Sequence, residues 1–350
     1  MEFNLDKILR ENIKKLIPYS SARDEFKGEA TIFLDANENN FGSPLAENYN
    51  RYPDPLQLEV KQKISQIKGV PPQNIFLGNG SDEAIDILFR AFCRPGIDNV
   101  IIPSPTYGMY EVSANINDVE IKKVNLFADF QLNIETISEA VNENTKLIFI
   151  CSPNNPTGNS FNREDIEVIL NNFEGIVVID EAYINFSKQR SFINELTEYP
   201  NLVVLQTLSK AWGLAGLRVG MAFASEQIIN IFNKVKPPYN INAASQKLAI
   251  EALGDVGRIN SWIKQIVSER DRMAKALATL PYVITVFPSD SNFILVKTSN
   301  PKTIYDSLVS KGIIVRDRSK VQLCEGCIRI TIGTAEENIV VWNSLKEIQA

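Results

Sequence analysis

Short apolar runs and amphipathic helical patterns alternate along the middle of the chain. In one helical pattern, Ile85, Leu88, Phe89 and Phe92 fall on one face. Strands that alternate with helices in this way indicate an α/β domain with a mostly parallel sheet between helices. The apolar runs that predict strands are residues 74–77, 99–102, 146–151, 175–180 and 201–206.

The pattern changes after Pro237 and Pro238, and the mixture that follows indicates a smaller α+β domain. A chain of 350 residues is long enough for one large domain and a lesser one. The elements expected in this part are helices at 243–252, 261–280 and 302–311, and strands at 283–287, 292–297, 313–316 and 327–332.

Composition narrows the kind of protein. With 44% hydrophobic and 22% charged residues, the chain has the make-up of an ordinary soluble globular protein. A net charge of −6 argues against a general nucleic-acid surface. No apolar run has the length of a membrane span, and residues 1–20 lack the apolar core of a signal peptide. We therefore expect a cytoplasmic protein that binds neither nucleic acid nor membranes.

The chain contains no histidine, which excludes several kinds of active site. A Ser-His-Asp triad, a histidine general base and the usual zinc enzymes all need this residue. Cys324 and Cys327 have the spacing of half a zinc site, but there is no second pair to complete it. We expect no metal, and a catalyst that relies on Lys, Tyr, Cys or carboxylates.

Polar side chains follow the expected strands at their carboxyl ends, where open α/β sheets bind ligands. Residues 78–82 lead into a helix whose N-terminus either binds a phosphate or is simply capped by Ser81 or Asp82. Asn155 lies between two prolines, in a rigid turn that can also present its amide to a ligand. Asp180 ends a buried strand and needs a partner, such as a cationic ring nitrogen.

The most informative stretch is residues 207–218, in which Lys210 follows a buried strand. Such a lysine can form a Schiff base with an aldehyde cofactor. The hydroxyls of Thr207 and Ser209, with Arg218, can hold the phosphate of that cofactor. Alone, the stretch is only suggestive, because lysines near strand ends are usually solvated surface groups, so the interpretation depends on the other three segments.

Together the four segments resemble the fold-type I aminotransferases that use pyridoxal 5′-phosphate. The resemblance implies that Lys210 forms the Schiff base and then acts as the general base, and that Asp180 pairs with the ring nitrogen. Tyr107 would stack on the ring, unless it is a buried core tyrosine. The other implied contacts are Asn155 and Tyr183 to the phenolic oxygen, and Thr207, Ser209, Arg218 and the Ser81 and Asp82 amides to the phosphate.

Five further segments are similar to the histidinol-phosphate aminotransferases: residues 18–23, 34–39, 51–54, 106–110 and 329–334. This similarity implies that Tyr52 reaches the cofactor phosphate of a neighbouring subunit, in a homodimer with shared active sites. It implies that Arg316 and Arg329 bind the anionic groups of the substrates and that Tyr19 contacts a phosphate. For Arg316, surface ion pairing is a serious alternative.

The expected reaction is transfer of an amino group between L-histidinol phosphate and 2-oxoglutarate, giving imidazole acetol phosphate and glutamate in histidine biosynthesis. An aromatic or broad-specificity aminotransferase and a decarboxylase of a phosphorylated amino acid remain alternatives. A cofactor-binding regulator is disfavoured because no helix-turn-helix segment is appended. The expected division is an N-terminal arm, part of the small domain, at 1–40, a large cofactor-binding domain at 41–255 and a small domain at 256–350.

Overall fold

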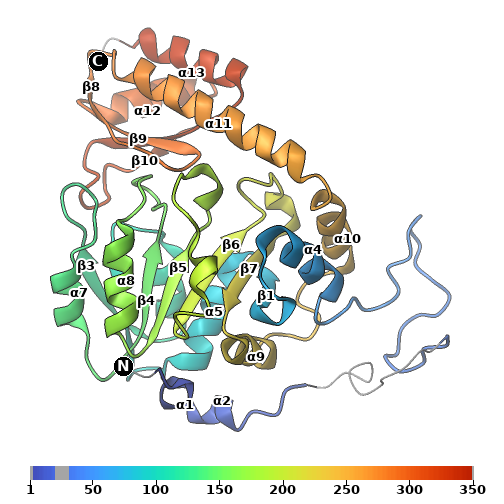
Figure 1. Cartoon of the computed structure of the whole chain (residues 1–350). Coiled ribbons are helices and arrows are strands. Elements are labelled where there is room, and N and C mark those ends of the chain that lie inside the picture. Colours follow the sequence, from blue (N-terminus) through green and yellow to red (C-terminus); the bar gives the residue numbers. More distant parts are fainter. Residues whose placement is uncertain (1–2, 20–30, 349–350) are drawn as a thin grey trace.

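The larger of two sheets forms the centre of the molecule. The computed structural model describes residues 3–19 and 31–348. Its larger sheet has seven strands in the order β1-β7-β6-β5-β4-β2-β3, and β7 runs antiparallel to β1 and β6 while the other pairs are parallel (Figure 1). The predicted mostly parallel α/β sheet is confirmed. Its strands are β1 (Ile75–Asn79), β2 (Asn99–Ser104), β3 (Glu120–Asn125), β4 (Thr145–Cys151), β5 (Ile176–Asp180), β6 (Leu202–Thr207) and β7 (Val219–Ala224).

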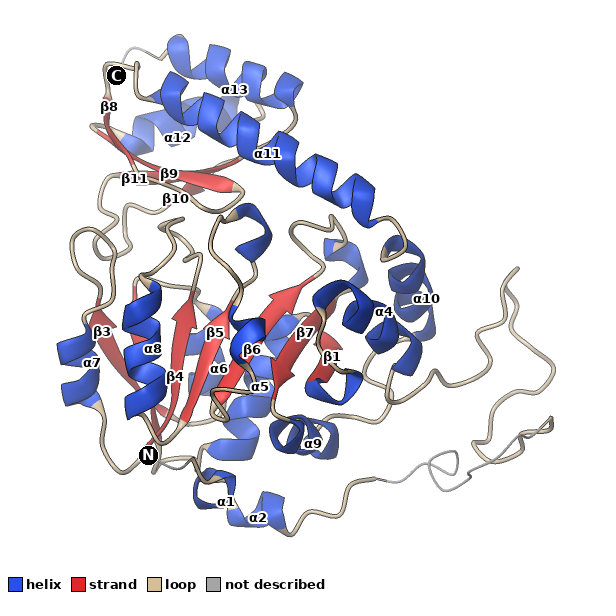
Figure 2. Ribbon diagram, in the orientation of Figure 1, coloured by secondary structure: helices blue, strands red, loops and turns tan. Residues whose placement is uncertain are grey.

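Helices cover both faces of this sheet, because successive side chains of a strand point to opposite faces. In β5, Val177 and Ile179 pack into the core beneath α4, α7 and α8. Ile176 and Val178 pack into the opposite core, beneath α5, α6 and α9 (Figure 2). The helices are α4 (Leu58–Lys68), α5 (Ser81–Phe92), α6 (Met109–Ile116), α7 (Ile134–Ala140), α8 (Arg163–Asn172) and α9 (Glu226–Val235).

A second, four-stranded sheet in the order β10-β11-β9-β8 lies across from the carboxyl ends of β4, β5 and β6 (Figure 2). Its apolar side chains form a third core with α11, α12 and α13. The loops after the parallel strands lie between the two sheets (Figure 2). The elements are α10 (Ala243–Ala252), α11 (Val256–Leu277), β8 (Val283–Val286), β9 (Phe293–Thr298), α12 (Pro301–Ser310), β10 (Arg316–Asp317), β11 (Cys327–Thr331) and α13 (Ala335–Lys346).

Several sequence-based boundaries were wrong. Strands β3 and β7 were not predicted: β3 is a polar strand at the edge of the sheet, and β7 is rich in small residues. Helix α11 begins at Val256 instead of residue 261, because the Asp255 side chain accepts a hydrogen bond from the Arg258 N–H at 3.0 Å and caps it. The strand expected at 313–316 is only Arg316–Asp317, since Ile313 and Val315 pack against the third core before the pairing with β11 begins.

The N-terminal segment has two differently placed parts. Helices α1 (Leu5–Ile8) and α2 (Glu11–Lys14) lie against the large sheet's helices, where Leu9 and Ile13 enter the core and the Arg10 N–H donates to the Ala91 carbonyl at 3.1 Å. The extended segment before α4 projects from the body of the molecule (Figure 1), and it returns to the body where Tyr52 stacks on Tyr239 and Gln57 is buried. Within the described ranges, no helix is both long and apolar enough to cross a membrane. The domain limits at residues 40 and 255 remain predictions.

Candidate active site

A cavity of about 790 Å³ lies between the carboxyl ends of the parallel strands and the β10–β11 edge. It contains every predicted site residue except Tyr19 and Tyr52. Residues far apart in the chain are therefore brought into one pocket, as the four segments predicted. These residues are Ser81, Asp82, Tyr107, Asn155, Asp180, Tyr183, Thr207, Ser209, Lys210, Arg218, Arg316 and Arg329.

Lys210 lies in the turn that follows β6. The turn is held by the Gly213 N–H, which donates to the Lys210 carbonyl at 3.1 Å. The Lys210 ammonium lies 5.7 Å from the centre of the Tyr183 ring. Partial burial, and then the positive charges of Arg329 and Arg218, lower the pKa of Lys210, although Asp180 and Asp82 oppose this. The lowered pKa enlarges the neutral fraction of an amine that faces an open pocket, so Lys210 can act as a nucleophile and as a base.

The turn from β1 into α5 has the geometry of an anion site. Gly80, at φ +72°, is the N-cap residue of α5, and no side chain caps this twelve-residue helix. The alternative that Ser81 or Asp82 caps the helix is therefore wrong. The amides of its first turn are unpaired within the helix and lie at the positive end of its dipole, where phosphate binds readily.

Basic and hydroxyl groups surround this helix end. Arg218 is in the left-handed region at φ +54°, and its guanidinium lies 3.2 Å from Asp82 Oδ2. The Thr207 hydroxyl lies 3.0 Å from that of Ser209 and accepts from the Ser209 N–H at 3.0 Å. The Tyr107 hydroxyl donates to Asp82 Oδ1 at 3.1 Å. The predicted phosphate-binding residues therefore lie together at the start of α5.

Gly220, in β7, allows the backbone at the start of α5 to lie close to that strand, and replacement of Gly220 tests this packing. A Cβ at Gly220 would lie 2.1 Å from the Ser81 nitrogen. Gly220→Ala is expected to lower the free energy of unfolding by about 1–3 kcal/mol, measured by guanidinium unfolding. Gly216→Ala is the matched control, because a Cβ at Gly216 meets nothing within 4 Å. Equal unfolding midpoints for the two variants would contradict the packing argument.

Asp180 is the buried carboxylate of the pocket, with 3% of its surface exposed. Burial raises the pKa of Asp180 to about 6, while hydrogen bonds from the Tyr110 hydroxyl at 2.7 Å and the Ala182 N–H at 3.1 Å act against this. Among the described residues, no basic side chain forms a salt bridge with it. A cationic group bound in the pocket would supply the missing charge.

Tyr110 was missed by the sequence analysis. It is fully buried, stacks on Phe149 with ring centres 4.8 Å apart, and meets the Tyr107 ring edge-on at 5.5 Å. It lies in the first turn of α6, three residues after Tyr107, which precedes the helix. The sequence signalled a buried aromatic residue, but nothing in it showed that the hydroxyl meets a carboxylate 70 positions away.

Replacing Tyr110 by phenylalanine keeps the ring and removes only the donor to Asp180. Because this bond lowers the pKa of Asp180, the pKa should rise in the variant and less carboxylate should be ionised near pH 6. We expect cofactor affinity to fall by about tenfold to a hundredfold, with the larger loss at lower pH. Titration of the cofactor-free protein at several pH values measures this, and a uniform loss at every pH would contradict it.

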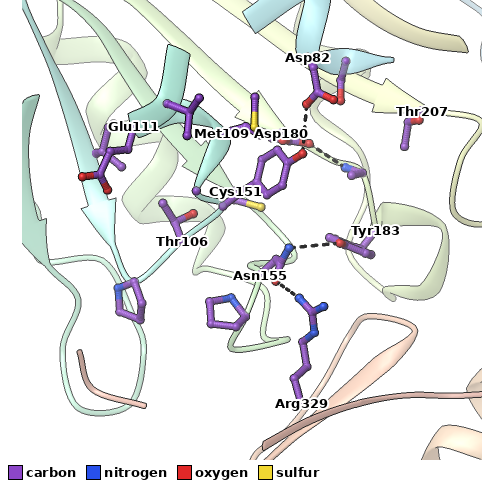
Figure 3. Close-up of a pocket in the computed structure, with 18 of the residues that line it drawn as sticks. Asp82, Thr106, Met109, Glu111, Cys151, Asn155, Asp180, Tyr183, Thr207 and Arg329 are labelled. Atoms are coloured by element: carbon purple, nitrogen blue, oxygen red, sulfur yellow. Dashed lines mark hydrogen bonds between the residues drawn. The ribbon is translucent and has the colours of Figure 1, made fainter. Parts of the chain in front are cut away.

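Asn155 and Tyr183 lie side by side, as predicted (Figure 3). Asn155 Nδ2 donates to the Tyr183 hydroxyl at 3.4 Å, and Asn155 Oδ1 accepts from the Arg329 guanidinium. The neighbouring Asn154 instead holds the loop, since its amide donates to the Pro105 carbonyl at 2.9 Å and to Thr157 Oγ1 at 2.8 Å. Only one of the two adjacent asparagines therefore presents its amide to the pocket.

Three arginines come from β10, from β11 and from the residue that follows β10. Arg316 and Arg329 are directly opposite each other in the β10–β11 pairing, and Arg329 also lies 5.0 Å from the centre of the Phe293 ring. The alternative that Arg316 forms a surface ion pair is not supported, because it makes no salt bridge within the described part of the chain. Arg318, which the sequence analysis did not select, lines the same cavity.

Tyr19 and Tyr52 lie outside this pocket. They line a second cavity of about 440 Å³ with Asp35, Asn37 and Tyr239. Tyr52 is 49% exposed and stacks on Tyr239 with ring centres 4.5 Å apart, while Tyr19 is 73% exposed. Within one chain, neither tyrosine reaches Lys210's pocket. Residues 20–23 of the N-terminal similarity lie outside the described residues.

The fold and the pocket agree with one enzyme class. Residues 33–345 match the family model of class I and II aminotransferases, and the chain belongs to that family. The histidinol-phosphate aminotransferases of Parabacteroides distasonis and Cytophaga hutchinsonii are 54% and 55% identical to it, each comparison covering 99% of both chains. The resemblance found in the sequence is thus confirmed.

A solved structure is also similar. The histidinol-phosphate aminotransferase of Sinorhizobium meliloti, in complex with pyridoxal 5′-phosphate, superposes with a TM-score of 0.79 at 26% identity over 89% of both chains. The fold-type I architecture expected from the sequence is confirmed by this likeness.

Proposed function

We propose that this chain is a pyridoxal-phosphate-dependent aminotransferase that moves an amino group between L-histidinol phosphate and 2-oxoglutarate in histidine biosynthesis. The main observation is that Lys210 opens onto a pocket between the uncompensated carboxylate of Asp180 and the guanidinium of Arg329. The names of the relatives that are 54% and 55% identical supply the substrate.

The pocket fits the cofactor at four points. The uncapped N-terminus of α5, with Thr207, Ser209 and Arg218, suits its phosphate. Asp180 suits its cationic ring nitrogen, and Asn155 and Tyr183 suit its phenolic oxygen. Tyr107, which lines the cavity, would stack on the ring. When bound, pyridoxal phosphate supplies an aldehyde that captures amines and a ring that accepts electrons from the reacting carbon.

In the mechanism we infer, Lys210 Nζ moves the proton. In its neutral form Nζ would accept the proton from the substrate Cα, and as an ammonium it would deliver that proton to the carbon that carried the cofactor's aldehyde oxygen. Ionised Asp180 would hold positive charge at the ring nitrogen, and this charge would stabilise the negative charge that develops at Cα. The Asn155 amide and the Tyr183 hydroxyl would hold the phenolic oxygen of the ring through hydrogen bonds.

The substrate's anionic groups would be bound by the second sheet. Arg316 and Arg329 present guanidinium groups across the pocket from Lys210, and such groups can bind either a carboxylate or a phosphate. Tyr19 would contact a substrate phosphate.

We further propose a cytoplasmic homodimer in which Tyr52 reaches the cofactor phosphate of the other subunit. Its exposure and its distance from its own chain's pocket support this proposal. The N-terminal arm at 1–40, the large domain at 41–255 and the small domain at 256–350 are proposed as the units of each subunit.

Assay of the purified protein with pyridoxal phosphate tests the proposed function. Histidinol phosphate and 2-oxoglutarate together should yield glutamate, and omission of either should stop its formation. Turnover with phenylalanine but not with histidinol phosphate would replace this proposal by an aromatic aminotransferase. Release of carbon dioxide from a phosphorylated amino acid would replace it by a decarboxylase.

A further inference from the structure

We infer that Arg318 is a third anion-binding residue of the substrate pocket and makes the pocket selective for a phosphate monoester over a carboxylate. This inference rests on the proposed function and assigns one of its specificity determinants. It is carried by the position of Arg318 beside Arg316 and Arg329, and by the lack of an acidic partner for any of the three within the described residues.

The backbone places the three arginines together. Arg316 pairs with Arg329 across β10 and β11. The Arg318 N–H donates to the Cys327 carbonyl at 2.9 Å, so the antiparallel pairing continues one step beyond β10. Alternate residues of an extended strand share a face, so Arg316 and Arg318 project to the same side. All three side chains line the cavity that contains Lys210.

The charges of these arginines are not neutralised by the protein. The adjacent acid, Asp317, instead accepts from the N–H and hydroxyl of Ser319, at 2.8 Å and 2.6 Å. Like charges directly opposite on neighbouring strands are destabilising. Burial, together with the neighbouring arginines, lowers the pKa of Arg318, and burial lowers that of Arg329.

Unused hydrogen-bond donors point to a ligand with several oxygens. The Nε atoms of Arg318 and Arg329 are buried without a hydrogen-bond partner among the described residues. A carboxylate has two oxygens and one charge, which Arg316 and Arg329 can satisfy as a pair. A phosphate monoester has three terminal oxygens and a charge of about −2 near pH 7. Its additional oxygen and charge require a further donor, and Arg318 is positioned to provide it.

Replacement of Arg318 by glutamine tests this role in the enzyme with bound cofactor. Each amino donor is mixed with it separately, and the spectral change of a single half-reaction gives the apparent affinity. For R318Q we expect histidinol phosphate to bind about tenfold to a hundredfold more weakly, and glutamate less than about threefold more weakly. Lys320→Gln is the matched control, because Lys320 is exposed on the same loop and does not line the cavity.

Inorganic phosphate gives a readout that does not depend on turnover. Calorimetry with the wild-type holoenzyme should detect phosphate binding that R318Q weakens by a similar factor and K320Q does not. The thermal midpoint of R318Q without phosphate should equal or exceed that of the wild type, since a like charge is removed. A merely structural arginine would instead lower it.

Equal losses for both donors, a loss for glutamate alone, or unchanged phosphate binding in R318Q would overturn the inference. If the wild-type enzyme did not use histidinol phosphate, the proposed function would fail. The phosphate calorimetry would still decide the role of Arg318, so the two failures are distinguishable.

Discussion

Replacing Lys210 by alanine should reduce amino-group transfer by about 10⁴-fold or more, because in the proposed mechanism this one side chain provides both covalent attachment and proton transfer. The variant should still bind the cofactor through the α5 N-terminus, Arg218 and Asp180, none of which the substitution touches. Steady-state turnover measures the first effect. The absorption spectrum of the bound cofactor measures the second, since the band that arises from attachment to lysine should be absent.

Two controls separate this role from a general loss of structure. Lys302→Ala removes a lysine whose side chain is 82% exposed and paired with Asp306, and it should leave turnover unchanged. Small primary amines added to Lys210→Ala should restore part of the activity, because they can enter the cavity and accept the Cα proton in place of Nζ. Normal turnover and a normal spectrum in Lys210→Ala would show that the assignment is wrong.

The site residues at the carboxyl ends of the parallel strands were predictable because one local sequence pattern indicates both the strand and the position of the site. A buried apolar run predicts a strand, and the next polar residues lie at the edge of the sheet where ligands bind. Asp180 and Lys210 were found in this way, and the structure places both in one cavity. The second sheet was expected from similar runs, although β10 is shorter than predicted.

Contacts that join distant segments were not predictable from one sequence. The bond from Tyr110 to Asp180 depends on how α6 packs against the sheet, where the Tyr110 ring stacks on Phe149 of β4, and no local pattern records that packing. Arg318 had an ordinary position in a polar loop, and only its pairing opposite Cys327 placed it beside Arg329. Tyr19 and Tyr52 lie outside the cavity that contains Lys210, so their roles remain predictions.

Replacing Asp180 by asparagine should remove the negative charge opposite the ring nitrogen while keeping the size of the side chain. The amide cannot hold positive charge there, so we expect turnover to fall by about a hundredfold to a thousandfold. Asp180→Glu, which keeps the charge but lengthens the side chain in a fully packed position, should also be impaired. A matched control is Asp306→Asn, at an exposed surface carboxylate. Wild-type turnover in Asp180→Asn would contradict the role of the charge.

The same substitution should stabilise the protein without cofactor. Burial raises the pKa of Asp180 from its ordinary value of 3.8 to about 6, so between these values the folded state holds a proton that the unfolded state has released. Stability therefore falls as pH rises from about 4 to 6, by about 3 kcal/mol in all, and the loss persists at pH 7. Asparagine does not ionise, so its burial causes no such loss of stability. Cofactor-free Asp180→Asn should therefore be more stable than the wild type at pH 7 and nearly equal to it at pH 4. Denaturant unfolding at both pH values measures the difference, and a constant difference would exclude Asp180 as its source.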